Sequence, residues 1–263
     1  MKINRDTVLR EMATALESEE FILALWLEGS DGTGSLDEYS DIDVVCYTKE
    51  GFTVEAIQRL DDCMRRMGQV DIEYEQPGRP DNNRYKVYHL QETSAHLLID
   101  VTIQSESFPV SFQREDQTVV PVVLFDKTSI VQYHNIDPVS HRTSLRSQLT
   151  EALGVYSQRS RAIKYTHRGL FLESLIYYQK YVLKPLVDVL RMIHTPFQAD
   201  CFLVHATRDF PAEVTVTLEH LYGVQSVQDI AERIDAADEL FRKAVAQAER
   251  LLAQMDESGH AGN

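Results

Sequence analysis

Residues 25–47, LWLEGSDGTGSLDEYSDIDVVCY, hold the pattern from which most of the interpretation of this chain follows. An apolar run leads into Gly29 and Ser30, where a residue without a side chain lets backbone amides approach an anionic ligand. After a glycine-rich loop, Asp41 and Asp43 stand at the head of a second apolar run. Because side chains alternate along a strand, we expect both carboxylates on one face, with the residue between them in the core.

These two carboxylates are candidates to bind a metal. Acids two residues apart on one strand face can share divalent cations, and an oxygen-rich site of this kind suits Mg²⁺. Asp100, in the segment HLLIDVTIQ, is the best third ligand because it is a single acid inside an otherwise apolar strand. An ionised carboxylate there is costly unless it is paired, metal-bound or exposed in a cleft. The sequence therefore predicts a metal site of Asp41, Asp43 and Asp100.

The chain resembles the DNA polymerase β-like nucleotidyltransferase superfamily in several short segments. The signature combines an apolar strand, Gly-Ser, a gap and an Asp-apolar-Asp-apolar run; here it is LEGS at 27–30, a ten-residue gap and DIDV at 41–44. LIDVT at 98–102 matches the family's third carboxylate. LFDK at 124–127, with the helical half after it, looks like the aminoglycoside adenylyltransferase branch. At Glu28, many members carry an aromatic or aliphatic residue, and an acid there either repels a nucleotide or points away from it.

The resemblance implies an activity. Such enzymes transfer a nucleoside monophosphate, here expected to be AMP from ATP, to a hydroxyl of a small, aminoglycoside-like acceptor and release pyrophosphate. Two Mg²⁺ ions would be held by Asp41, Asp43 and Asp100, with Asp100 on the ion nearest the acceptor. The implied nucleotide-binding residues in this part of the chain are Gly29, Ser30 and Ser40.

The chain has two halves with different periodicities. The expected strands are Ile22–Leu27, Ile42–Tyr47, Val70–Tyr74, Tyr85–Leu90, Leu97–Ile103 and Val119–Phe125, with helices at 6–18 and Val54–Met67. Helical spacing then covers 142–166, 168–192 with a kink or break at Pro185, 212–222 and 228–256. We expect an α+β protein: a nucleotidyltransferase domain over residues 1–140, with a mixed β-sheet flanked by helices, and an all-α helical bundle over 141–263.

The predicted helix at 168–192 offers further candidates. Glu173, Tyr177, Lys180, Lys184 and Arg191 recur at helical spacing and predict one polar stripe. Lys180, and after it Lys184, are candidates to contact the triphosphate, whereas Glu173 could meet a cationic acceptor. A solvated helix face with ordinary ion pairs explains the same spacing.

Composition excludes several classes of function. The 263 residues contain 26 Lys and Arg against 41 Asp and Glu, a net charge of −15, which counts against nucleic acid and anionic membranes as partners. The three cysteines form no CxxC, and the nine histidines form no metal-binding motif, so neither zinc nor a disulfide framework is indicated. With no apolar leader in the first twenty residues, we expect a cytoplasmic protein.

The same residues are compatible with two other functions. The acceptor could be a protein side chain, which would make this an AMPylating enzyme, although the helical half is larger than such enzymes need. The chain could also be a nucleotide-binding module without catalysis, although a purely binding module need not keep three costly acids. The expected partners are a nucleoside triphosphate and a small hydroxylated acceptor, with the protein a monomer or a homodimer.

Overall fold

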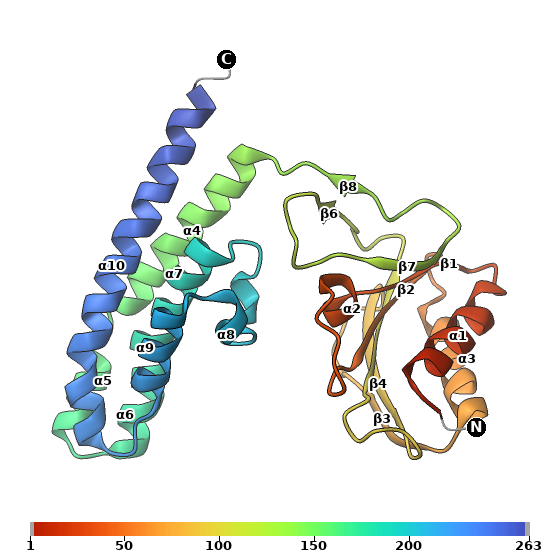
Figure 1. The fold of residues 1–263 in the computed structure, drawn as a ribbon, viewed down its shortest axis with the longest axis horizontal. Helices are drawn as coiled ribbons and strands as arrows, with labels where there is room; N and C mark the ends of the chain where they lie inside the picture. The colour runs from red at the N-terminus through yellow and green to blue at the C-terminus, as the bar shows by residue number, and fades with distance from the viewer. Residues whose placement is uncertain (1–2, 261–263) are drawn as a thin grey trace. The chain divides into compact units, whose positions relative to one another are not determined.

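The computed structural model describes residues 3–260, and the chain divides into two compact units, Met1–Ile136 and Asp137–Asn263 (Figure 1). The first unit combines a mixed sheet with helices, and the second is helical. The predicted α+β class is therefore confirmed. Among residues 3–260, no helix is both long and apolar enough to cross a membrane.

A six-stranded sheet of order β3-β4-β5-β2-β1-β7 forms the centre of the first unit. Its strands are β1 (Ile22–Leu27), β2 (Ile42–Thr48), β3 (Val70–Glu75), β4 (Asn83–Leu90), β5 (Ile99–Ser105) and β7 (Val122–Asp126). All six were predicted, with ends shifted by a few residues. β2 and β5 pair in parallel, and the chain between them supplies the crossover that a parallel pair requires.

Two helices, α1 (Arg5–Glu17) and α3 (Thr53–Met67), lie side by side over one face of this sheet (Figure 1). α1 buries Val8 and Met12, and α3 buries Leu60, all at the helical spacing seen in the sequence. These side chains share one apolar core with the residues of the strands that point toward the helices. This face therefore holds the main core of the unit.

The opposite face of the sheet is covered in part. Trp26 and Phe112 pack edge to face there, with ring centroids 6.0 Å apart, in a smaller core. Two short parallel strands that the sequence analysis missed, β6 (Phe112–Gln113) and β8 (Tyr133–His134), belong to the segment that covers this part. Toward β3 the same face is open, and Tyr74 is 52% exposed.

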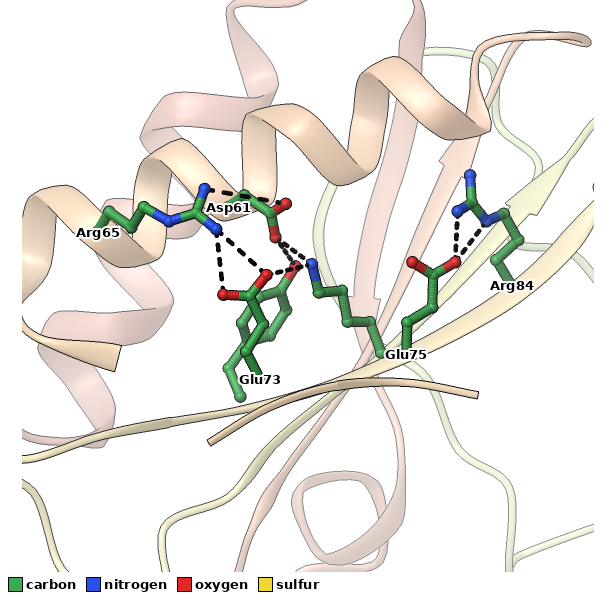
Figure 2. Close-up of polar contacts among 7 residues, drawn as sticks. Asp61, Arg65, Glu73, Glu75 and Arg84 are labelled. Carbon is green, nitrogen blue, oxygen red and sulfur yellow. Dashed lines mark hydrogen bonds and ion pairs between the residues drawn. The ribbon is translucent and has the colours of Figure 1, made fainter. Parts of the chain in front are cut away.

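A network of charges ties β3 and β4 to α3. Lys86, whose side chain is 5% exposed, donates from Nζ to Asp61 at 2.5 Å and to Glu73 at 2.9 Å. Figure 2 shows Asp61 and Arg65 on the helix facing Glu73 on the strand. The hydrogen bond from Lys86 lowers the pKa of the Glu73 carboxyl. The Asp61 side chain is largely buried and that of Glu73 is partly exposed, so the network closes the edge of the core with charges.

Replacing Lys86 by Met should lower the free energy of unfolding by about 1–2 kcal/mol, because two partly buried acids lose their shared cation. Urea unfolding measures the difference, with Lys49→Met at an exposed position as the control. A Lys86→Met variant as stable as the wild type would show that the network contributes nothing to stability.

The second unit is built from helices. They are α4 (Pro138–Tyr156), α5 (Ser160–His167), α6 (Phe171–Tyr178), a π-helical turn η1 (Gln179–Leu183), α7 (Lys184–His194), a 3₁₀ turn η2 (Ala199–Cys201), α8 (Ala206–Asp209), α9 (Ala212–Tyr222) and α10 (Val227–His260). α4, α7 and α10 pack on one another around a core that includes Leu145, Leu186 and Phe241. The single helix predicted at 142–166 is wrong, since α4 ends at Tyr156 and α5 begins after a short turn.

The sequence predicted a kink or a break at Pro185. The helical run does not break there; instead η1 precedes α7, and the Lys184 amide donates to the Gln179 carbonyl, five residues back. Because proline has no N–H to donate to the carbonyl four residues before it, a π turn absorbs the mismatch without ending the run. The predicted polar stripe is wrong at Arg191, which is fully buried and paired with Asp209 at 2.7 Å.

Candidate active site

Three carboxylates lie together where β2 and β5 run side by side. Asp43 and Asp100 are register partners in the parallel pair, and Asp41 stands two residues before Asp43. Ile42 and Ile99 are buried, so alternation places the acids on the partly open face of the sheet. One oxygen from each of the three carboxylates lies within 4.8 Å of the others. The structure thus brings the three predicted metal ligands together.

The electrostatics of the cluster favour a bound cation. Burial, together with the charges of Asp41 and Asp100, raises the pKa of Asp43 to about 6. Burial also raises the pKa of Asp100, and the charge of Asp41 adds to this. Like charges this close destabilise one another unless a cation lies between them. A donor set made only of oxygens, with excess negative charge, fits a hard divalent cation such as Mg²⁺.

Between β1 and β2 the chain forms a short helix, α2 (Gly29–Thr33), where the sequence predicted an irregular loop. The helix ends at Gly34, whose φ of +68° suits a left-handed cap. A Cβ on Gly32 would overlap the carbonyl oxygen of Val120, so the segment before β7 packs closely on this helix. Gly34 thus caps the short helix, and Gly32 lets the segment before β7 pack against it.

Gly29 itself lies against the acidic cluster. Its φ is +60°, and a Cβ at this position would overlap Asp43 Oδ2. Only a residue without a side chain lets the backbone come this close to the carboxylate. Beside it, Ser30 Oγ is buried without a hydrogen-bond partner among the residues that the structure describes. An unpartnered hydroxyl at this point is free to bond a ligand oxygen.

Arg5 joins the two segments that carry the site. Its guanidinium donates to the backbone oxygen of Asp41 at 2.6 Å and to that of Ser40 at 3.3 Å, and it pairs with Asp31 in α2. Arg5 therefore fixes α2 against the start of β2. The sequence analysis missed this residue, because its partners lie 26 to 36 positions away and nothing local marks it.

A cavity of about 270 Å³ opens beside the carboxylates. Its lining is Glu28, Gly29, Asp43, Val44, Val45, Tyr85, Asp100 and Thr102. The carboxylate of Glu28 accepts a hydrogen bond from Trp26 Nε1 at 2.8 Å, so one of its oxygens is held by the neighbouring core. Tyr85, which the sequence analysis missed, donates from its hydroxyl to Asp100 Oδ1 at 2.8 Å. The cavity gives a ligand access to the acids from this side.

Ser40 in the first unit and three residues of the second unit complete the set of predicted site residues. Ser40 Oγ donates to Asp37 Oδ1 at 2.8 Å and accepts from the Asp37 amide at 2.9 Å, so its hydroxyl already has two partners. Lys180, Lys184 and Glu173 are exposed side chains of the second unit. Lys184 pairs with Asp188 at 2.6 Å, whereas Lys180 Nζ lies over the Tyr181 ring, 5.4 Å from its centroid. The nucleotide contacts of Lys180 and Lys184 and the acceptor contact of Glu173 remain predictions.

Comparisons with known proteins point to one family. Residues 9–117 match the family model of the nucleotidyltransferase domain. The chain is similar in structure to an aminoglycoside 6-adenyltransferase from Bacillus subtilis, with 14% identity, a TM-score of 0.36, and 97% of this chain and 94% of the other covered. It is also similar to a spectinomycin adenyltransferase from Enterococcus faecialis, solved with ATP and spectinomycin, with 10% identity, a TM-score of 0.36, and coverage of 96% and 100%. TM-scores this low establish no shared activity. No curated protein is significantly similar in sequence.

Proposed function

We propose that this protein transfers AMP from ATP to a hydroxyl of a small, aminoglycoside-like acceptor and releases pyrophosphate. The match of residues 9–117 to the nucleotidyltransferase family model supports this proposal. The observation that carries the proposal is the cluster of Asp41, Asp43 and Asp100 beside Gly29. Oxygen ligands next to an open backbone turn are what a metal-bound triphosphate needs.

Asp41, Asp43 and Asp100 would hold two Mg²⁺ ions, with Asp100 serving the ion nearest the acceptor. When bound, such ions lower the pKa of the acceptor hydroxyl and neutralise the leaving pyrophosphate. Asp100 lies on β5, and Gly29 follows β1, on the other side of β2. We therefore assign the triphosphate to the β1 side and the acceptor to the β5 side.

In the transfer, the acceptor oxygen bonds to the α-phosphorus while the bond from that phosphorus to the bridging oxygen breaks. Pyrophosphate takes the electron pair of the broken bond, and we assign the hydroxyl proton to the Asp100 carboxylate. Because the reaction is mostly positioning and charge stabilisation, loss of one carboxylate should be severe.

The backbone amide of Gly29 and the hydroxyl of Ser30 would bond β- and γ-phosphate oxygens. Ser40, whose hydroxyl bonds Asp37, would instead hold the turn before β2 in shape. Ser30 is thus the hydroxyl in this part of the chain that we assign to the nucleotide.

Replacing Ser30 by Ala should weaken binding of ATP with Mg²⁺ about 10-fold without lowering stability, because the buried hydroxyl has no partner to lose within the described residues. Calorimetric titration and urea unfolding measure the two effects. Ser35→Ala, which removes an exposed hydroxyl bonded to Thr33, is the matched control. A Ser30→Ala variant that is less stable but binds ATP normally would contradict the assignment.

Pyrophosphate release tests the proposed function. We would assay four nucleoside triphosphates with Mg²⁺ against a panel of aminoglycosides and other hydroxylated antibiotics, with Asp100→Asn beside the wild type. The proposal predicts release that requires ATP, one acceptor and Asp100. Release that is independent of Asp100, or no nucleotide binding at all, would contradict it.

A further inference from the structure

The hydroxyl of Tyr85 makes an unusual contact with the carboxylate cluster. Tyr85 lies on β4, is a register partner of Thr102 on β5, and donates to Asp100 Oδ1 at 2.8 Å. Among the side chains that the structure describes, this is the one hydrogen bond donated to any carboxylate oxygen of Asp41, Asp43 or Asp100. The protein therefore orients one of its three metal-binding side chains directly.

The strand that carries Tyr85 is held firmly. Lys86, the next residue, points to the other face of the sheet and bonds Asp61 on α3 and Glu73 on β3, the network of Figure 2. The guanidinium of Arg79 lies over the Tyr85 ring, 5.5 Å from its centroid. With its backbone anchored and its ring covered, Tyr85 has little freedom to move its hydroxyl away from Asp100.

A bond of this kind selects an orientation of the carboxylate. With Oδ1 held by the tyrosine, rotation of the Asp100 side chain is restricted, and the other oxygen is left for a ligand. Partners one step removed from a metal typically change its affinity about 10- to 100-fold, because they fix the direction in which the ligand presents its lone pairs.

We infer that Tyr85 is a positioning residue for the divalent cation held by Asp100, acting through the orientation of that carboxylate. The inference rests on the proposed function for the presence of a metal at the three acids. The inference goes beyond the proposed function by assigning to Tyr85 a role that neither the motif nor the family match indicates.

Binding of Mn²⁺ to the full chain tests this, with the free ion counted by its electron paramagnetic resonance signal. Tyr85→Phe keeps the ring and removes the hydroxyl, and should weaken binding at least about 10-fold. Tyr74→Phe is the matched control, since Tyr74 is exposed on the same sheet face, on the neighbouring strand. It should bind Mn²⁺ as the wild type does.

A double-mutant cycle separates positioning from a general structural role. Asp100→Ala, which removes the acceptor of the Tyr85 hydrogen bond, should weaken binding strongly, and adding Tyr85→Phe to it should cause no further loss, because the tyrosine acts only through Asp100. Normal Mn²⁺ binding by Tyr85→Phe, or an equal loss in both backgrounds, would overturn the inference and leave the proposed function standing. A wild-type protein that binds no Mn²⁺ would overturn both.

Discussion

Asp43→Asn should abolish nucleotidyl transfer and yet make the metal-free protein more stable at pH 8. The loss of activity should be at least about 10³-fold, since Asp43 is one of the three carboxylates that would hold the metal. The gain in stability follows from the repulsion that the charged form of Asp43 experiences in the folded state.

Ionisation of Asp43 should lower the stability of the metal-free protein. The folded-state pKa of Asp43 is raised from 3.8 to about 6, so the group favours the folded state below pH 3.8 and loses this contribution as the pH rises through about 6. Each unit of pKa shift corresponds to about 1.4 kcal/mol. With allowance for solvent screening at this half-buried site, the gain should be about 1–2 kcal/mol.

Urea unfolding in EDTA at pH 5 and pH 8 measures this difference. The gain should be larger at pH 8 than at pH 5, where the wild-type carboxyl is largely protonated. Asp81→Asn, at an exposed position in the turn between β3 and β4, should change stability at neither pH. Wild-type turnover in Asp43→Asn, or a loss of stability at pH 8, would contradict the role assigned to this acid.

Gly29→Ala should disrupt the acidic cluster directly. Two effects add: the φ of +60° strains any L-residue, and the new Cβ would overlap Asp43 Oδ2. Either the carboxylate rotates away or the backbone shifts. We expect a loss of about 2–4 kcal/mol in stability together with a loss of divalent-cation binding.

Gly34→Ala is the matched control for this change. Gly34 has a similar φ of +68°, but a Cβ there meets nothing within 4 Å. The variant should therefore show the backbone strain alone, about 1 kcal/mol, with normal Mn²⁺ binding. Equal effects of Gly29→Ala and Gly34→Ala on both stability and Mn²⁺ binding would show that the contact with Asp43 is unimportant.

Local patterns predicted which three acids the fold brings together. Alternation along β2 placed Asp41 and Asp43 on one face, and a single acid in an apolar run identified Asp100. Tyr85 could not be found in this way, because its contact depends on the antiparallel register of β4 with β5. Arg5 depends on the packing of α1 near the start of β2, which no local pattern encodes.

In the second unit, too, local patterns predicted some features and missed those that depend on tertiary contacts. Helical spacing predicted where helices occur, because each buries an apolar side. It did not predict the π turn that precedes Pro185, or the burial of Arg191. That residue donates to the carbonyl oxygens of Phe202 and Val204, which lie 11 and 13 residues further along the chain, beyond the end of α7. A buried arginine and an exposed one have the same spacing in the sequence, and only tertiary contacts distinguish them.

Transfer of label from ATP carrying radioactive phosphorus in its α-phosphate tests the central claim most directly. With Mg²⁺ and an acceptor, the wild type should move the label to the acceptor and release one pyrophosphate for each labelled product. The Asp41→Asn and Asp43→Asn variants should move none. Release of the γ-phosphate with the label left in ADP, or transfer that survives loss of either acid, would contradict the account.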